Sequence, residues 1–496
     1  MFATAFNGLI ARLREGSEGI ALLTGSGKVT WGELGRRVAG LRLALDGLRE
    51  PGPVLVRGHK QADVVAAMIA AVCAGRGFVF AEANFPAARV GQIIATCGCA
   101  GLIDVAGDGF AVPLPMIDAA RVADAPSRLT PLDPADEAML FYVTFTSGST
   151  GQPKGIPVSR ANFAAFLSWM EPHVAGSMAG PDAAVNHASM AFDMSMSDIW
   201  LALLAGRASY LLDHAHNVNP HANIAFLSRD RDVPPGTLMS TPAFLGILLE
   251  SRHFCAARLP RLRAFWVGGE EVPKPLLLRL RRAFPGSVIY HAYGPSEVTC
   301  VTHCHPLSDA DLSGDDPLTL GLAHGGTRVL VDCGDGVLRT EGEGEIVLAG
   351  AQVAGRYLPA DHPNNVNFGT HEGTPCYRTG DRGILSPGGA MRILGRIDRQ
   401  VKINGLRIEQ GAIEQSALEV PGIEVAVAVL RKQGVKSLML ILGGRAMPRD
   451  GVERVRAHLA AALPPYMQPS RIEVCEDVPL TLSGKIDRRG VQSLYA

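Results

Sequence analysis

Hydrophobic residues in the N-terminal half of the chain alternate between helical and strand-like spacing. The pattern predicts a helix over 30–45, a strand over 53–57, a helix over 63–74 and a strand over 77–81. Segment 63–74 is a nearly continuous run of small apolar residues, as expected of a helix that packs on a sheet. Strands that alternate with helices favour a mostly parallel sheet covered by helices. We therefore predict an α/β fold for this half.

The pattern changes in the second half of the chain. From about residue 316 to 396 it consists of short β-rich runs separated by glycines, typical of a small barrel-like lobe or a distorted sheet. Beyond this lobe, helices are predicted over 410–418 and 451–463, and strands over 425–430 and 438–442. The sequence thus predicts an N-terminal domain (1–397, β-rich lobe at about 316–396), a junction at 398–399 and a small α+β domain (400–496).

Composition narrows the possible functions. Of 496 residues, 47 are Lys or Arg and 48 are Asp or Glu, so the formal net charge is −1. Hydrophobic residues make up 47% of the chain, enough to bury a large core, which excludes global disorder. The net charge is close to zero and no run of Lys and Arg stands out, so the sequence does not indicate electrostatic binding of a nucleic acid. The function must be inferred from motifs.

The sequence gives no sign of membrane insertion or export. Its longest apolar stretch, 64–75, is shorter than the ~20 residues that span a bilayer. The N-terminus lacks the basic region and the cleavage site of a signal peptide and reads as an amphipathic helix. Nine cysteines are too few and too irregularly spaced for a disulfide framework. We expect a cytoplasmic protein.

The densest chemical signal is the segment Phe145-Thr-Ser-Gly-Ser-Thr-Gly-Gln-Pro-Lys-Gly155. Small hydroxyl residues and glycines leave backbone N–H groups open to phosphate oxygens, and Lys154 supplies positive charge. The segment lacks the Gly-Lys-Ser/Thr ending of a Walker loop and the Gly-x-Ser-x-Gly of a nucleophile elbow. Taken alone, it is also compatible with a flexible surface loop.

Further motifs occur in order along the chain. They are Trp31-Gly-Glu-Leu34, Phe192-Asp-Met-Ser195, Gly268-Gly-Glu270, Tyr293-Gly-Pro-Ser-Glu297, Gly344-Glu-Ile-Val-Leu-Ala-Gly350, Tyr377-Arg-Thr-Gly-Asp381, Gly395-Arg-Ile-Asp-Arg-Gln-Val-Lys402, Leu463-Pro-Pro-Tyr-Met467 and Ser483-Gly-Lys485. With the loop, this series resembles the adenylate-forming superfamily over nearly the whole chain. Within it, the series is most similar to nonribosomal peptide synthetase adenylation domains and D-alanine–carrier-protein ligases. The resemblance implies helix-covered parallel sheets, a small β-barrel-like lobe and a mobile C-terminal lid domain.

The resemblance also implies an ATP site. Tyr293 would lie flat on adenine, Asp381 would accept both ribose hydroxyls, and Arg396 would hold the nucleotide near its ribose and phosphate. His291 stands where the family often has Asn, so its contact with adenine is open. The full set of implied ATP-binding residues is Thr146, Ser147, Gly148, Ser149, Thr150, Gly151, Lys154, Gly269, Glu270, His291, Ala292, Tyr293, Gly294, Pro295, Ser296, Asp381, Ile393, Arg396 and Lys485.

Three residues would serve the chemistry itself. Lys485, on the C-terminal domain, would stabilise the charge that develops as a carboxylate attacks the α-phosphate. Glu297 would hold Mg²⁺, a hard cation that prefers carboxylate oxygen. His187 resembles a position that gates the substrate carboxylate, although a histidine satisfied within the core is an equal alternative.

Asp193 indicates the substrate class. In the amino-acid branch, this aspartate pairs with the substrate's α-ammonium group, a charge that acid–CoA ligases do not need. The alternative is an aspartate that caps a helix, since Ser195 and Ser197 follow. The implied substrate pocket consists of Asp193, Met194, Ser197, Ser240, Trp266, Gly268, Ala292, Cys300 and Val301.

The size of this pocket suggests a small amino acid. Trp266 would shorten it and Gly268 would open one wall, which favours alanine, glycine, serine or a proline-sized substrate. Trp266 could equally be a core residue that points away. Cys300, Cys304 and neighbouring histidines are too crowded on one strand for a tetrahedral metal site, and we expect no metal there.

The predicted function is a ligase with two half-reactions. The amino acid first attacks ATP to form aminoacyl-AMP with Mg²⁺, and the C-terminal domain then swings about Asp398. A phosphopantetheine thiol of a carrier protein then displaces AMP. No carrier attachment motif follows Lys485 and no condensation segment precedes Thr146, so we expect a stand-alone ligase with a separate carrier. The alternatives are an acid–CoA ligase of the same superfamily and a relative that only binds nucleotide.

Overall fold

The computed structural model describes the chain except for residues 147–152, 179, 181, 214–217, 315, 399, 432–435, 444–447, 449, 476–477, 480–485 and 496. The chain forms two compact units. Unit 1 comprises Met1–Ala83, Cys97–Thr144 and Ile156–Ile397. Unit 2 comprises Asn84–Thr96, Phe145–Gly155 and Asp398–Ala496. The domain boundaries proposed from the sequence stay a prediction.

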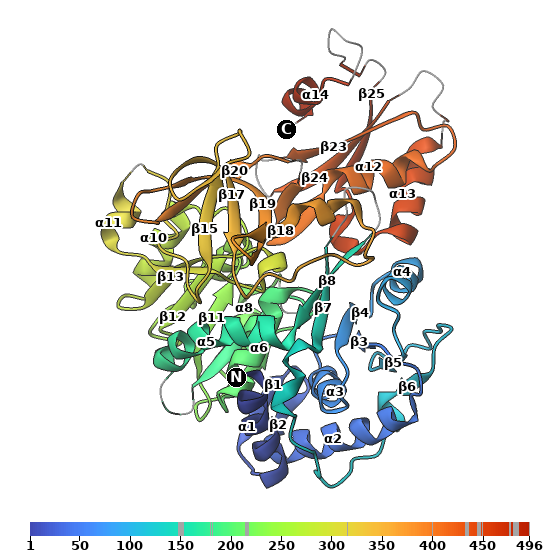
Figure 1. Cartoon of the computed structure of the whole chain (residues 1–496), viewed down its shortest axis with the longest axis vertical. Coiled ribbons are helices and arrows are strands. Elements are labelled where there is room, and N and C mark those ends of the chain that lie inside the picture. The colour runs from blue at the N-terminus through green and yellow to red at the C-terminus, as the bar shows by residue number, and fades with distance from the viewer. Residues whose placement is uncertain are drawn as a thin grey trace. The chain divides into compact units, whose positions relative to one another are not determined.

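An eight-stranded sheet forms the larger part of unit 1 (Figure 1). Its strands, in spatial order, are β14 (His303–Pro306), β13 (Val288–Tyr293), β12 (Ala264–Gly268), β11 (Pro235–Ser240), β9 (Ala183–Asn186), β10 (Ser209–Leu211), β1 (Ile20–Thr24) and β2 (Gly27–Thr30). All neighbours are parallel except the two edge strands, β14 and β2. The carboxyl ends of β9, β11, β12 and β13 therefore lie along one edge of the sheet, where several of the predicted site residues follow.

A second sheet has six strands. In spatial order they are β6 (Met116–Asp118), β5 (Gly101–Asp104), β3 (Val54–Gly58), β4 (Phe78–Glu82), β7 (Leu140–Thr146) and β8 (Lys154–Ser159). The neighbours from β6 to β7 are parallel. β3 and β4 are buried along their whole length, which explains why they read as continuous apolar runs rather than as alternating ones.

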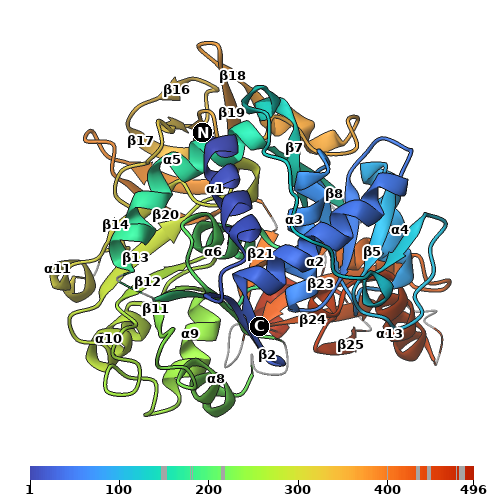
Figure 2. The same cartoon turned by 90° about the horizontal axis from the view of Figure 1, so that it is seen from below.

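Helices cover both faces of the larger sheet. One core packs α1 (Phe2–Glu15), α2 (Trp31–Ala44), α3 (Ala62–Cys73), α5 (Arg160–Ser177) and α6 (Asp193–Leu204) with residues of both sheets. The other core packs the opposite face of the larger sheet against α8 (Pro220–Leu227), α9 (Pro242–Leu249) and α10 (Lys274–Ala283). Figure 2 shows α1 beside α5 and α2, with which it makes contact.

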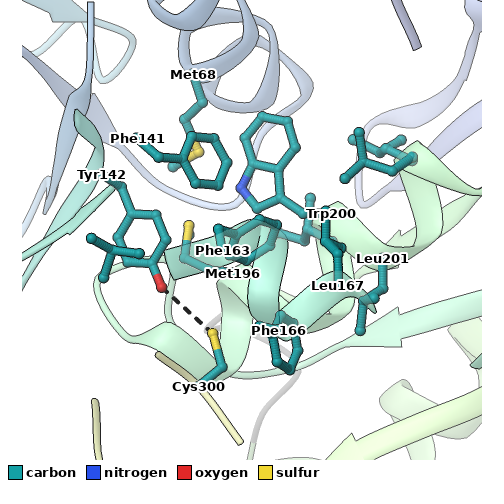
Figure 3. Packing of buried hydrophobic residues seen from close by; sticks show 14 of the residues in the cluster. Met68, Phe141, Tyr142, Phe163, Phe166, Leu167, Met196, Trp200, Leu201 and Cys300 are labelled. Carbon is teal, nitrogen blue, oxygen red and sulfur yellow. Dashed lines mark hydrogen bonds between the residues drawn. The ribbon is translucent and has the colours of Figure 1, made fainter. Parts of the chain in front are cut away.

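Aromatic side chains fill the centre of the first core (Figure 3). Trp200 of α6 is fully buried, and its ring lies 5.1 Å from that of Phe141 and 5.7 Å from that of Phe6. Tyr142 stands at the edge of this cluster, and its hydroxyl lies 3.5 Å from Sγ of Cys300. Because α6 begins at Asp193, this packing fixes the position of the helix that carries Asp193, the residue predicted to bind the substrate's ammonium group.

The β-rich lobe predicted near 316–396 is an antiparallel sheet within unit 1. Its spatial order is β16 (Leu338–Arg339), β15 (Arg328–Asp332), β17 (Gly342–Ala349), β19 (Thr374–Leu385) and β18 (Phe368–His371), with β20 (Met391–Arg396) also paired to β19. The short helix α11 (Asp309–Ser313) precedes it. β19 and β20 carry Asp381 and Arg396 as direct cross-strand partners.

Unit 2 has a core of its own. β23 (Val425–Arg431), β24 (Ser437–Gly443) and β25 (Arg471–Cys475) form one sheet, and β21 (Gln400–Ile403) pairs with β22 (Leu406–Glu409). The helices α12 (Gln410–Leu418) and α13 (Gly451–Ala462) pack on the sheet, and α14 (Arg488–Tyr495) contacts β23. Most of α4 (Ala87–Cys97) also belongs to this unit.

The predicted fold class is confirmed. The helices expected over 30–45 and 63–74 are α2 and α3, and the strands expected over 53–57 and 77–81 are β3 and β4, each within one residue at either end. β25 was not predicted, although its first four residues, Arg-Ile-Glu-Val, alternate polar and apolar side chains. In the described part of the chain, no helix combines the length and the hydrophobicity required to cross a membrane.

Candidate active site

Three strands of unit 1 bring Tyr293, Asp381 and Arg396 together. The hydroxyl of Tyr293, at the end of β13, donates a 2.6 Å hydrogen bond to Oδ2 of Asp381. Nη1 of Arg396 donates to Oδ1 of the same carboxylate at 2.9 Å and to the carbonyl of Thr379 at 2.7 Å. Burial, and then the charge of Asp381, raises the pKa of Tyr293, so its hydroxyl stays protonated and remains a donor. Of the other residues predicted to bind ATP, Ile393 lies nearby in sequence on β20 and packs against the first core.

The turn after β13 carries Glu297 in the short helix η4 (Ser296–Val298). Its carboxylate is fully buried, and the hydroxyl of Tyr357 donates to Oε1. The hydroxyl of Tyr377 lies 2.8 Å from that of Tyr357. Gly294 and Pro295 precede this helix, of which Ser296 is the first residue. Gly294 has no room for a side chain, since a Cβ would overlap the carbonyl oxygen of Cys300. The turn is therefore folded tightly back on itself.

His291 is held in one tautomer. Its Nδ1 lies 2.9 Å from the carbonyl oxygen of Thr319, so Nδ1 carries the hydrogen and donates it. Burial lowers the pKa of His291, which favours the neutral ring. Nε2 of a neutral ring with hydrogen on Nδ1 is an acceptor.

His187 is also neutral. It follows β9, is buried, and stacks on Phe244 with ring centres 4.2 Å apart. Its Nε2 accepts the backbone N–H of Thr241 at 3.3 Å, which leaves the hydrogen on Nδ1. Burial, and then the charge of Lys60, places the pKa of His187 well below its usual value. His187 is therefore a hydrogen-bond donor through Nδ1 rather than a cation.

Asp193 is the first residue of α6, next to several other predicted pocket residues. Its backbone carbonyl accepts the hydroxyl of Ser197 at 3.1 Å and lies 3.6 Å from Sγ of Cys300. Burial, and then the charge of Asp193, raises the pKa of Cys300 to about 12, so the thiol is not ionised. Met194 is partly buried against the first core, and Val301 is buried.

Other predicted pocket residues share one face of the large sheet. Trp266 and Gly268 alternate with Phe265 and Val267 on β12, and Gly268 is the cross-strand partner of Ala292. Trp266 stacks on Tyr290 with ring centres 4.9 Å apart, and its Nε1 donates to Sγ of Cys304 at 3.1 Å. A Cβ at Gly268 would overlap the carbonyl of Ala292, so close strand packing also requires this glycine.

Two predicted residues have structural partners of their own. Ser240 is the cross-strand partner of Val267, which belongs to the second core, and its hydroxyl donates to the carbonyl of Thr241 at 2.9 Å. Glu270 follows Gly269, which has φ 85°, and its Oε1 accepts the backbone N–H of Ala243 in the first turn of α9 at 3.1 Å.

The predicted phosphate loop belongs to unit 2. Thr146 is buried at the end of β7, and its Oγ1 has no hydrogen-bond partner among the described contacts. Lys154, at the start of β8, is fully buried, and its Nζ lies 3.4 Å from Oε1 of Glu409. Asp398, the predicted hinge, accepts the backbone N–H of Gln400 at 3.1 Å. Ser147, Gly148, Ser149, Thr150, Gly151 and Lys485 lie outside the described residues.

Sequence reasoning missed several residues that hold this site. Gln352 and Tyr357 contact the turn around Glu297, and Tyr142 contacts Cys300. The side-chain amide of Asn186 donates to Oγ of Ser195 and Oδ1 of Asp198 in α6, at 2.8 Å each. The backbone carbonyl of Asn186 lies 3.4 Å from Nζ of Lys60. No local pattern marks these residues, since their partners are distant in sequence. In the ranges that the structure describes, no group of three or more His, Cys, Asp or Glu is placed to hold a metal ion.

Comparisons with known proteins agree with this geometry. The profile of the AMP-binding enzyme family matches residues 11–358, more than half of the chain. The D-alanine--D-alanyl carrier protein ligase of Lactiplantibacillus plantarum is 30% identical, with 93% of each chain covered. The ligase of the same name from Listeria monocytogenes is 29% identical over 89% of this chain and 88% of its own.

A solved structure extends the likeness to three dimensions. PA1221, an NRPS protein containing adenylation and PCP domains, superposes with a TM-score of 0.81 at 25% identity, covering 99% of this chain and 98% of its own. The resemblance inferred from the motifs is confirmed, and the chain belongs to the AMP-binding enzyme family.

Proposed function

We propose that this enzyme activates a small amino acid with ATP as aminoacyl-AMP and transfers it to the phosphopantetheine thiol of a separate carrier protein. The observation that carries the proposal is Asp193, which places a carboxylate on the first turn of α6 and whose backbone carbonyl contacts Ser197 and Cys300. The names of the D-alanine--D-alanyl carrier protein ligases support the same substrate class and acceptor.

Asp193 suits an ammonium group. The first turn of a helix favours negative charge through its open N–H groups, so the start of α6 complements the carboxylate of Asp193. A substrate ammonium group could pair with this carboxylate in a partly buried site, where an ion pair is favourable when both charges are present. A small substrate side chain would be enclosed by Met194, Trp266, Gly268, Ala292 and Val301. Ser240 is included in the proposed pocket from its sequence position alone.

The nucleotide would bind through groups that are already oriented. Tyr293 presents its ring, while its hydroxyl and Arg396 hold the carboxylate of Asp381. Each carboxylate oxygen can accept more than one hydrogen bond, so Asp381 retains capacity for two ribose hydroxyls. Nε2 of His291 can accept the adenine amino group, the task that the family often gives to Asn. Backbone groups of Gly269, Glu270, Ala292, Gly294, Pro295 and Ser296 and the side chains of Ile393 and Arg396 complete the proposed set.

The triphosphate would be held by the loop that contains Thr146 and Lys154. The buried Oγ1 of Thr146, which has no hydrogen-bond partner among the described residues, fits an anionic ligand. Lys154, which is paired with Glu409, enters the proposal from its motif. Ser147, Gly148, Ser149, Thr150, Gly151 and Lys485 enter this proposal from their motifs alone. His187 would donate from Nδ1 to the substrate carboxylate before it attacks the α-phosphate.

We assign Glu297 to Mg²⁺. One carboxylate together with substrate phosphates is a usual ligand set for this ion, and the buried Glu297 fits that chemistry. When bound, the ion neutralises phosphate charge. Tyr357 orients the carboxylate by donating to its Oε1.

The test is ATP–pyrophosphate exchange with glycine, serine, proline and both enantiomers of alanine, in the parent and in Asp193→Asn. We expect exchange with at least one amino acid and a loss of roughly 100-fold or more in the variant, since a buried charge pair loses ~3–5 kcal/mol when one partner is removed. Ser195→Ala, on the same turn of α6, is the matched control and should keep exchange. Exchange with simple carboxylic acids but with no amino acid would contradict the proposal.

The acceptor is tested separately. The parent should load a phosphopantetheinylated carrier protein and should form little thioester with free CoA. Acylation of CoA at the rate of carrier loading would support the acid–CoA ligase instead.

A further inference from the structure

The buried side-chain amide of Gln352 stabilises the turn that follows Glu297. Nε2 of Gln352 donates toward the carbonyl oxygens of Val298, Thr299 and Val301 at 3.2, 3.1 and 3.0 Å. Gln352 is 1% exposed, so these hydrogen bonds are shielded from water. Carbonyls buried without donors are costly, so the turn depends on this amide.

The orientation of the Gln352 amide is itself fixed. Nε1 of Trp169 donates to its Oε1 at 2.8 Å, which leaves Nε2 facing the turn. The indole of Trp169 stacks on His324 with ring centres 4.7 Å apart. The next residue, Gly325, has no space for a Cβ, which would overlap the indole. The amide therefore cannot exchange its two ends without losing the bond from Trp169.

The backbone around Gln352 adds two more links to the same turn. Oγ1 of Thr299 donates to the carbonyl of Gln352 at 2.6 Å, and the N–H of Ala354 donates to the carbonyl of Glu297 at 2.9 Å. Two short segments, more than fifty residues apart in sequence, are thus joined by both side-chain and main-chain hydrogen bonds.

The turn needs this support because its backbone is strained. Thr299 has φ 49° and Cys300 has φ 66°, both in the left-handed region that residues with a Cβ rarely adopt. Thr299 is β-branched, for which this conformation is especially unfavourable. Such backbone persists only where the surrounding structure holds it, and it is found most often at functional sites.

The turn lies between two parts of the site. Glu297, the carboxylate assigned to Mg²⁺, precedes it, and Cys300 and Val301 of the proposed amino-acid pocket form its end. We propose that Gln352 is a positioning residue that sets the metal carboxylate and the wall of the amino-acid pocket together. This inference rests on the proposed function, and it adds a buried residue that acts through the turn.

The experiment compares Gln352→Met and Gln352→Glu with the parent. Met keeps the length of the side chain but has no donor, while Glu keeps an acceptor for Trp169 and has no donor for the turn. In both variants we expect the KM for the amino acid to rise about tenfold or more, as expected when buried carbonyls lose their donor. The Mg²⁺ concentration for half-maximal exchange should rise in parallel. AMP affinity measured without Mg²⁺ should stay within about twofold, because Tyr293, Asp381 and Arg396 are untouched.

The matched control is Gln468→Met. The amide of Gln468 also donates to two backbone carbonyls, those of Leu459 and Leu463, at 2.8 and 2.9 Å, but these lie in unit 2. This variant should lower Tm and leave the KM for the amino acid unchanged. Trp169→Phe removes the bond that orients Gln352 and replaces the indole that stacks on His324 by a smaller ring. It should raise the same KM by a smaller factor and serves if the Gln352 variants do not fold.

Two results would overturn the inference. In the first, the parent enzyme exchanges with amino acids, and the Gln352 variants have a lower Tm but the same KM for the amino acid. The other is an AMP affinity that falls as far as the amino-acid affinity, which would indicate a general structural role. A parent that activates no amino acid would overturn the proposed function and this inference together, an outcome distinct from the first two.

Discussion

The hydroxyl of Tyr293 donates a 2.6 Å hydrogen bond to Oδ2 of Asp381, although 88 residues separate them in sequence. Arg396 holds the other oxygen of the carboxylate from the neighbouring strand. The large parallel sheet and the β-rich lobe of unit 1 are thereby joined at the residues proposed to bind adenine and ribose. The carboxylate of Asp381 therefore stabilises the fold and would also position the nucleotide.

This relationship predicts different effects for two conservative variants. Tyr293→Phe keeps the ring but removes a hydrogen bond to a charged group, which should lower the free energy of unfolding by about 1.5–3 kcal/mol while AMP affinity changes little. Asp381→Asn should weaken AMP binding by roughly 10–100-fold, because one ribose hydroxyl loses a charged acceptor. Calorimetric titration with AMP and chemical denaturation measure both. Equal losses of AMP affinity in the two variants would show that the hydroxyl, and not only the carboxylate, binds the nucleotide.

The buried pair Lys154–Glu409 leads to a second prediction. Lys154 is fully buried and Glu409 is nearly so, with Nζ and Oε1 3.4 Å apart. Lys154→Met and Glu409→Leu should each destabilise the protein by about 3–5 kcal/mol, because each removes one member of a buried ion pair. The double variant should recover much of this loss.

An exposed ion pair serves as the control for that cycle. Arg339 and Asp335 are 40% and 53% exposed, and Asp335→Asn should cost less than about 1 kcal/mol. Chemical denaturation of the parent, the two single variants and the double variant gives the coupling energy. Strict additivity of Lys154→Met and Glu409→Leu would mean that the two charges do not depend on each other.

A third prediction concerns Lys485, for which the motif Ser483-Gly-Lys485 is the only basis. Lys485→Ala should slow adenylate formation by about 10²–10³-fold, the usual loss when one preorganised charge is removed from a developing anion. AMP affinity and Tm should remain close to those of the parent. Pyrophosphate exchange within a few-fold of the parent would refute the assigned role.

The buried cluster behind α6 predicts a dependence of stability on pH. Burial raises the pKa of Asp198 from 3.8 to about 8, against the opposing hydrogen bond from Asn186 and the charge of Lys60. Between these two values the unfolded chain ionises while the folded one does not, so the contribution of Asp198 to stability is lost as pH rises. Burial lowers the pKa of Lys60 from 10.5 to about 7, so its own effect, of opposite sign, acts mainly above pH 7.

Asp198→Asn removes this group and keeps the acceptor for Asn186. The stability of the variant relative to the parent should therefore increase by about 1–3 kcal/mol between pH 5 and pH 7. Thermal denaturation at the two pH values measures the change. Ser195→Ala, which removes the neutral partner of the same Asn186 amide, should shift stability equally at both pH values. If the difference in stability between Asp198→Asn and the parent is the same at both pH values, the titration of Asp198 is not the cause of the pH dependence.

Local sequence alone was enough to predict several elements and the family. Thr30 and Glu33 form a capping box at the start of α2, and the apolar run of α3 needs no distant partner to be recognised. The ordered motifs identified the AMP-binding enzyme family for a related reason: each motif is a short contiguous segment whose residue types carry its chemistry.

Tertiary structure decided how those residues are held. Tyr293 meets Asp381, Gln352 supports the turn after Glu297, and Asn186 links Lys60 to α6 only because the strands bring distant segments together. The register of β11 and β12 likewise placed Ser240 beside Val267, which no spacing in the sequence indicates. The pKa values of Asp198 and His187 depend on burial by residues from other elements, so they exist only in the folded chain. A sequence pattern records which groups are present, whereas their partners, burial and charge environment arise from long-range packing.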